Sequence, residues 1–238
     1  MPEPGAPKVT ASRSYRAMVL QYRIQEVLHL GAPGKQLERV ALRPGEIVVD
    51  WGCGPGRVTI PVAKAVKGLL KNDASPPECD WYARETDAGS GNSSAIGATE
   101  NTLSRSQVHS SGQGVAIQQP PKGGKVLAVD VERLALQVVR EKAARESLDN
   151  VYTILVESHP VAIPTGSVDL VLLLDTFHAV RDKEGLLSDI GRVLKPDGHL
   201  FMDPGHMSPE KALEQVGASG LFSLEDAWGR EMLFAKAL

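Results

Sequence analysis

The sequence has few cysteines, almost no net charge and no long apolar run, and each shortage excludes a class of protein. Two cysteines, Cys53 and Cys79, are too few for a disulfide framework or a cysteine-rich zinc site. With 26 Lys and Arg against 29 Asp and Glu, the net charge of −3 argues against nucleic-acid binding through bulk charge. The most apolar run, Leu170–Leu174, is too short to cross a bilayer. Since the first residues lack the apolar core of a secretory signal, we expect a cytoplasmic protein without membrane contact.

The length predicts one large domain with an additional segment. The chain has 238 residues, of which 42% are hydrophobic, enough for a substantial core. Residues 1–11 are expected to form a disordered N-terminus, and residues 12–238 a single domain. Residues 71–122 interrupt this domain with a stretch rich in Ser, Gly, Asn and Gln and without sustained apolar periodicity. A low-complexity stretch of this length is predicted to be a largely disordered insertion.

Outside the insertion, apolar strands alternate with amphipathic helices. Short apolar runs predict buried parallel strands, and apolar residues three or four apart predict helices. The expected strands are 46–50, 125–130, 151–156, 168–174, 199–202 and 231–236, and the expected helices are 12–30, 57–66, 132–146, 182–194 and a segment that starts at Ser208-Pro209. This alternation predicts an α/β, Rossmann-like fold with a doubly wound and mostly parallel sheet. Ligands of such folds bind at the carboxyl ends of the strands.

A glycine-rich loop follows the first expected strand. Residues 50–56 read Asp-Trp-Gly-Cys-Gly-Pro-Gly, and glycines allow the backbone to turn sharply and to approach a ligand closely. A helix that begins after such a loop offers free N–H groups to a ligand. Because a third glycine of the dinucleotide pattern would fall at Arg57, the G-x-G-x-x-G fingerprint fails. The loop therefore predicts a ligand site of another kind.

The second strand ends at an acidic residue, Asp130. Without the insertion, this residue follows Gly56 by about 20 residues, the interval at which a carboxylate reaches ribose hydroxyls in this topology. The simpler alternative is that Asp130 caps the next helix. The carboxylate can accept hydrogen bonds from two hydroxyls, so we favour the ribose role.

With these motifs together, the chain resembles the class I S-adenosylmethionine-dependent methyltransferases of the small-molecule methyltransferase-domain type. The resemblance covers residues 12–238 apart from the insertion. It implies a final antiparallel strand in the sheet, S-adenosyl-L-methionine as the cofactor and transfer of its methyl group as the reaction. The motifs that carry it are VVDWGCGPGR (48–57), VLAVD (126–130), GSVDLVLLLDTFHAV (166–180) and RVLKPDGHLFMD (192–203).

The same resemblance implies which residues hold the cofactor. The first loop would frame the methionine part and the ribose, Asp130 would hold the ribose hydroxyls, and Val131 would pack on the adenine. The loop residues concerned are Asp50, Gly52, Cys53, Gly54 and Gly56, among which Cys53 is expected to serve as a small packing residue.

The sequence departs from the family pattern after the third strand. The family usually places an acidic residue there, before a Leu-Pro pair, to contact the adenine amino group. Alignment of Ile163-Pro164 with this pair puts His159 at the acidic position, with Glu157 two residues earlier. Either Glu157 substitutes for the missing acid, or the adenine is held less tightly.

Residues after the fourth and fifth strands are candidates for the chemistry. Asp175 and His178 follow the fourth strand, where the reacting methyl group would lie, and a histidine is a natural base near neutral pH. Asp175 is expected to support the cofactor or the substrate, and a purely structural role for His178 is an equal alternative. His206 could be a second acid or base, or a metal ligand together with Asp203 and His178, but these residues form no metal-ligand spacing signature, so we expect no metal.

The methyl acceptor is constrained mainly by missing motifs. No Asn/Asp-Pro-Pro-Tyr/Phe stretch follows the fourth strand, which argues against methylation of DNA bases or protein glutamine, and the lack of a cysteine cluster argues against arsenite. A small organic acceptor, methylated at O, C or N, is therefore expected. The alternatives are an NAD-binding oxidoreductase and a non-catalytic scaffold of the same fold. No repeat or heptad pattern indicates an oligomeric state.

Overall fold

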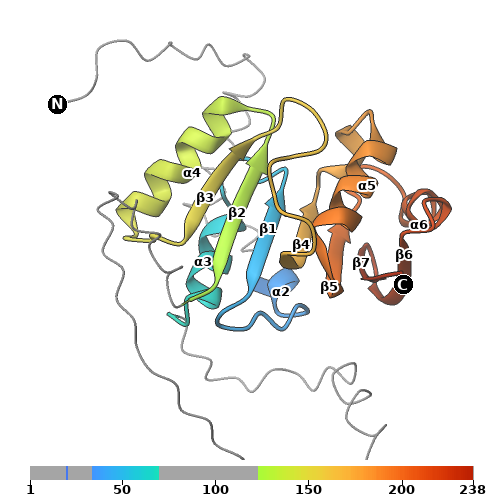
Figure 1. The fold of residues 1–238 in the computed structure, drawn as a ribbon, viewed down its shortest axis with the longest axis horizontal. Helices are drawn as coiled ribbons and strands as arrows, with labels where there is room; N and C mark the ends of the chain where they lie inside the picture. The colour runs from blue at the N-terminus through green and yellow to red at the C-terminus, as the bar shows by residue number, and fades with distance from the viewer. Residues whose placement is uncertain (1–19, 21–33, 70–122, 238) are drawn as a thin grey trace, which may run out of the picture.

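The computed structural model describes residue 20 and the segments 34–69 and 123–237 (Figure 1). Three predictions lie outside these residues: the disordered N-terminus at 1–11, most of the helix expected at 12–30, and the insertion at 71–122. The remaining predicted elements can all be compared with the structure.

A sheet of seven strands forms the centre of the molecule, in the order β3-β2-β1-β4-β5-β7-β6. The first five strands pair in parallel, and β7 is antiparallel to both of its neighbours. The predicted doubly wound sheet with a late antiparallel strand is therefore confirmed. The strands are β1 (Ile47–Trp51), β2 (Lys125–Asp130), β3 (Val151–Leu155), β4 (Val168–Leu174), β5 (Leu194–Asp203), β6 (Phe222–Trp228) and β7 (Glu231–Lys236).

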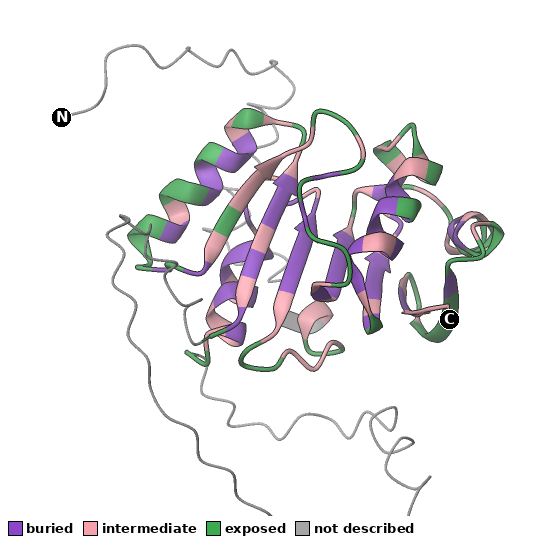
Figure 2. Cartoon of the chain, viewed as in Figure 1, coloured by how far each residue is buried: buried purple, intermediate pink, exposed green. Residues whose placement is uncertain are grey.

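Helices cover both faces of the sheet because successive strand residues point to opposite faces. Val48, Leu170 and Leu172 pack with α3 and α4 on one face. Val49 and Val171 pack with α5 and α6 on the other. Figure 2 shows the central strands largely buried and the outer face of α4 exposed. The helices are α2 (Gly34–Leu37), α3 (Thr59–Val66), α4 (Arg133–Arg145), the 3-10 turn η1 (Phe177–Ala179), α5 (Lys183–Val193) and α6 (Pro209–Ala218).

Two helices begin at a side chain that caps them. Ser208 accepts a hydrogen bond from the backbone N–H of Lys211, and Pro209 occupies the first position of α6. Asp182 accepts from the backbone N–H of Gly185 at the start of α5. Each cap satisfies a donor that the helix itself leaves unpaired.

The structure adds one strand that the sequence pattern does not predict. β6 (Phe222–Trp228) pairs with β7 at the edge of the sheet, and Phe222 is its one fully buried residue. β5 also begins earlier than expected, at Leu194, with a register shift against β4 between Val168 and Leu170. Among the described helices, none has the length and apolar character that a bilayer span requires.

Candidate functional site

The glycine-rich loop after β1 is fastened to the end of β2 by backbone hydrogen bonds. The N–H groups of Gly52 and Cys53 both donate to the carbonyl of Val129, at 2.8 and 3.1 Å. The N–H of Gly54 donates to Asp130 Oδ2 at 2.8 Å, and the N–H of Glu132 donates to Asp130 Oδ1 at 2.9 Å. The Asp130 carboxylate therefore joins the loop to the turn that precedes α4.

Asp130 retains capacity to bind a ligand. Each carboxylate oxygen has two acceptor positions. Oδ1 accepts the Glu132 N–H, whereas Oδ2 accepts the Gly54 N–H and, at 4.0 Å, the weak donor of the Cys53 thiol. Oδ1 therefore keeps a position for a hydroxyl, and a second hydroxyl can displace the weak thiol contact on Oδ2. Burial raises the pKa of Asp130, and the N–H groups of Glu132 and Gly54 counteract this. The neighbouring Val131 side chain is 68% exposed, although it is apolar. A carboxylate beside an uncovered apolar side chain fits a ribose attached to a flat base.

Asp50 supports this loop from the interior. Its side chain is buried, and Oδ2 accepts a 2.6 Å hydrogen bond from the Thr59 hydroxyl at the start of α3. Burial, together with the charge of Asp130, raises the pKa of Asp50 to about 6, and the bond from Thr59 limits the rise. Cys53 is buried beside them, and burial raises the pKa of its thiol. The burial of Cys53 supports a packing role for it.

The raised pKa of Asp50 leads to a test by stability. Between pH 4 and 6 the folded state holds a proton that the unfolded state has lost, so the free energy of unfolding falls as the pH rises through this range. Asp50→Asn keeps an acceptor for Thr59 and cannot ionise. We expect the variant to be more stable than the wild type by about 3 kcal/mol at pH 7.5, and the difference to shrink towards pH 4. Urea denaturation across this range measures it.

Asp197→Asn is the control. Asp197 is exposed and lies away from the glycine loop, so this variant should leave the pH profile of stability unchanged. If Asp50→Asn gave the same stability difference at pH 4.5 and pH 7.5, an ordinary pKa for Asp50 would follow.

His159, at the position where the family pattern has an acid, is held by a buried carboxylate. Asp189 of α5 bonds His159 Nδ1 at 3.0 Å and the Val161 N–H at 2.7 Å through Oδ2, while its Oδ1 pairs with Arg192. The His159 ring lies 6.0 Å from the ring of Trp51, centroid to centroid, in a stacked arrangement. His159 thereby fastens the loop after β3 to the start of the glycine loop.

Glu157 lies on the surface. It forms an ion pair with Arg133 at 2.8 Å, and both side chains are more than half exposed. This pair links the end of β3 to the first residue of α4 and leaves the second oxygen of Glu157 for other partners.

The candidate reacting residues meet at the ends of β4 and β5. Asp175 has a positive φ of 51° and lies with Oδ1 3.8 Å from His178 Nδ1. The His178 ring contacts the His206 ring edge-to-face at 4.9 Å between centroids. His206 therefore groups with His178, as the sequence suggested, but with Asp175 in place of Asp203. Asp203 instead accepts the N–H of Gly205 at 2.9 Å.

Thr176 brings this cluster next to the glycine loop, and the sequence analysis did not single it out. Its hydroxyl lies 3.4 Å from the Gly52 carbonyl and 3.0 Å from that of Leu174. A Cβ added to Gly52, whose φ is +79°, would lie 2.2 Å from Thr176 Oγ1. Only glycine permits this approach, so the candidate reacting residues lie next to the glycine-rich loop.

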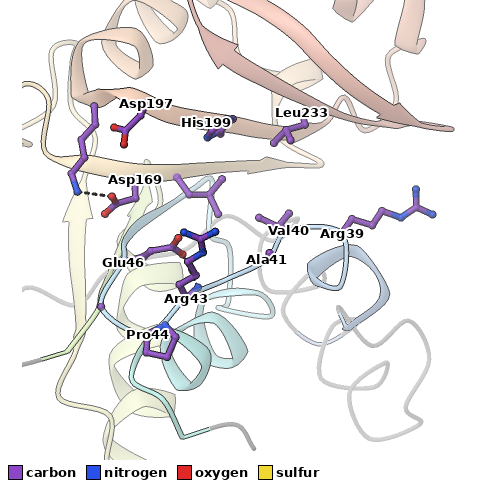
Figure 3. Close-up of a pocket in the computed structure, with 13 residues that line it drawn as sticks. Arg39, Val40, Ala41, Arg43, Pro44, Glu46, Asp169, Asp197, His199 and Leu233 are labelled. Carbon is purple, nitrogen blue, oxygen red and sulfur yellow. Dashed lines mark hydrogen bonds and ion pairs between the residues drawn. The ribbon is translucent and has the colours of Figure 1, made fainter. Parts of the chain in front are cut away.

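A separate cavity of about 410 Å³ lies where β1 and β4 begin, at the edge opposite to these motifs. Glu46, Asp169 and Asp197 are among the residues that line it (Figure 3). Asp169 is engaged there by Lys195 at 2.5 Å and by the N–H of Ile47. This cavity contains none of the predicted site residues.

Comparison with known families identifies the same fold. A family profile described as "Methyltransferase domain" matches residues 109–202, which are less than half of the chain. No curated protein sequence matches the chain. The profile and the fold together confirm the resemblance to class I S-adenosylmethionine-dependent methyltransferases and support S-adenosyl-L-methionine as the cofactor.

Solved structures share the architecture at low sequence identity. A SAM-dependent methyltransferase from Aquifex aeolicus is 18% identical, with a TM-score of 0.55 over 85% of this chain and 86% of that one. A putative S-adenosyl-L-methionine-dependent methyltransferase from Methanococcus maripaludis is 12% identical, with a TM-score of 0.61 over 98% of both. The [4+2]-cyclase SpnF is 16% identical, with a TM-score of 0.50 over 80% of this chain and 56% of that one.

Proposed function

We propose that this chain, which has the fold of the class I S-adenosyl-L-methionine-dependent methyltransferases, methylates a small organic acceptor at O, C or N. The observation that carries the proposal is the continuity between the Asp130–glycine loop region and the Asp175–His178 cluster through the Thr176–Gly52 contact. A nucleoside-type cofactor and an acceptor would thus lie side by side at one edge of the sheet.

Different residues would bind the three parts of the cofactor. Asp130 would hold the ribose hydroxyls, Val131 would cover the base, and the backbone of Gly52–Gly56 would surround the methionine part. The buried Asp50 accepts a hydrogen bond from the Thr59 hydroxyl at the start of α3, and this bond would hold the loop between β1 and α3 in place. When bound, S-adenosyl-L-methionine supplies an electrophilic methyl group on a sulfonium.

The methyl acceptor must be aligned with the methyl group, and some acceptors must also lose a proton. An in-line displacement needs the acceptor held close to the reacting carbon, which is a matter of positioning. An acceptor that must lose a proton also needs a base, and we assign this role to His178. Asp175 Oδ1 lies 3.8 Å from His178 Nδ1, so a carboxylate stands beside the proposed base. The Asp175 N–H donates to the Asp203 carbonyl at the end of β5, and we expect its side chain also to support the cofactor or the substrate.

The role of His178 is tested by methyl transfer from radiolabelled S-adenosyl-L-methionine to a panel of phenols, carboxylic acids and amines. With an acceptor that must be deprotonated, His178→Asn is expected to lower kcat by at least about 100-fold and to leave cofactor affinity unchanged.

The matched control is His199→Asn, because His199 pairs with Glu225 at 3.1 Å away from the site, and it should retain wild-type rates. Equal rates for His178→Asn and the wild type would contradict the base assignment. Binding of the cofactor without transfer to any acceptor in the panel would favour the non-catalytic scaffold. Binding of NAD in its place would favour the oxidoreductase.

A further inference from the structure

Three metal-ligating side chains converge where β4 and β5 end. Asp175, His178 and His206 each offer one ligand atom, and these atoms all lie within 4.8 Å of one another. Two of the residues come from the turn after β4 and one from the turn after β5, so the parallel strands bring them together. Two imidazoles and one carboxylate form a donor set that zinc and other divalent transition metals prefer.

One polar atom in the cluster is buried and has no hydrogen-bond partner. His178 Nδ1 is inaccessible to solvent and makes no hydrogen bond, although a buried polar nitrogen is costly to leave unpaired. The closest charged atom is Asp175 Oδ1 at 3.8 Å, too far for a direct bond. A cation between the two would satisfy both, because it would accept the nitrogen lone pair and neutralise the carboxylate.

Gly205 leaves the space that such an ion requires. A Cβ added at this residue would lie 2.3 Å from His178 Nδ1 and 2.4 Å from Asp175 Oδ1. The Gly205 backbone therefore lies against the cluster, and any side chain at this residue would occupy the space between His178 and Asp175. The positive φ of +65° also favours glycine at this position.

The Arg230 guanidinium, which bonds the Gly205 carbonyl beside this cluster, has other partners. Arg230 donates to the backbone carbonyls of Gly205 and Met207 and lies 3.8 Å from Asp203 Oδ1. Its charge is thus directed towards the β5 turn and Asp203. The Asp175 carboxylate is more than half exposed and is thus accessible to another cation.

We propose that Asp175, His178 and His206 form a binding site for one divalent transition-metal ion. Ligand atoms around a tetrahedral ion are about 3.4 Å apart for bonds of about 2.1 Å. The widest separation must therefore shorten by roughly 1.4 Å, which the exposed side chains of Asp175 and His206 can provide by rotation. Water and the acceptor would complete the coordination.

This site refines the proposed function and rests on it for its catalytic meaning. With the ion bound, His178 Nδ1 is a ligand and accepts no proton. The ion then binds the acceptor oxygen and lowers its pKa, so the acceptor loses its proton to water, and the base role of His178 applies to the metal-free protein. An acceptor with a hydroxyl group is the class that this arrangement suits.

Metal binding is tested with Co²⁺ on the full chain, by calorimetry and by visible absorption. We expect one equivalent to bind with absorption typical of nitrogen and oxygen ligands, and Zn²⁺ to displace it. His206→Asn and Asp175→Asn should each weaken binding by more than about 100-fold, beyond the effect of losing an outer-shell partner. His199→Asn is the matched control and should bind Co²⁺ like the wild type.

Gly205→Ala provides a second variant, since it retains all three ligands and should also weaken binding. Unchanged Co²⁺ affinity in His206→Asn and Asp175→Asn would overturn the proposal, as would no binding by the wild type. S-adenosyl-L-homocysteine is titrated in parallel as a separate readout. Its failure to bind, with Co²⁺ binding intact, would overturn the methyltransferase function and leave the metal site standing.

Discussion

Replacement of Asp130 by alanine is expected to weaken S-adenosyl-L-homocysteine binding by about 100-fold or more. The carboxylate would lose two hydrogen bonds to ribose hydroxyls, and bonds to a charged group contribute about 1.5–3 kcal/mol each, against 1.4 kcal/mol for each tenfold change in Kd. The N–H groups of Gly54 and Glu132 would also lose their shared acceptor. Isothermal titration calorimetry measures the change directly.

Asp130→Asn is a graded companion, because it keeps one acceptor and should bind between the two extremes. Asp197→Ala serves as the control, since this exposed residue lines the cavity at the opposite edge and should leave affinity unchanged. NAD is titrated alongside and is not expected to bind. Equal affinity in Asp130→Ala and the wild type would show that the ribose lies elsewhere.

Replacement of Asp189 by alanine is expected to lower the free energy of unfolding by about 3 kcal/mol, more than the other substitutions predicted to destabilise the protein. The buried carboxylate holds the His159 ring, the Val161 N–H and the Arg192 guanidinium. Its removal leaves a buried N–H without an acceptor and a partly buried cation without its counter-charge. For a domain of this size the loss corresponds to a fall in Tm of roughly 9 °C, which calorimetry or circular dichroism can follow.

A surface ion pair supplies the contrast. Asp149 pairs with Lys67 at 2.7 Å while its side chain is 77% exposed, and such pairs contribute little, so Asp149→Ala should leave the Tm nearly unchanged. Asp189→Asn should fall between, because it retains an acceptor for Val161 and loses the charge that Arg192 needs. If Asp189→Ala had the same Tm as the wild type, the contacts of Asp189 with His159, Val161 and Arg192 would make no net contribution to stability.

Most of the sheet could be predicted because its central strands are buried on both faces. Val48, Val49, Leu172 and Leu173 are fully buried, so their strands read as apolar runs with no alternation. β6 could not be predicted in this way. It lies at the edge of the sheet and exposes Ser223 to Ala227, so it has no apolar period to reveal it, and only its pairing with β7 makes it a strand.

Some residues of the candidate site could be predicted from the sequence in the same way, and others could not. The loop after β1 and Asp130 could be predicted because each adjoins a strand with a clear apolar pattern. The partner of His159 could not, because Asp189 lies 30 residues away on α5 and only the packing of that helix on the sheet brings it near. The grouping of His206 with Asp175 likewise depends on how two turns approach, and no spacing in the sequence encodes that.

The unpredicted strand also determines how the sheet ends. An exposed edge strand offers unpaired backbone groups to any neighbouring chain. In β6 the pairing register shifts between Leu224 and Asp226, and the adjacent Glu225 and Asp226 are both exposed. An interrupted register and two neighbouring negative charges both oppose the addition of another strand. The strand that is hardest to find in the sequence therefore protects this edge of the fold against aggregation.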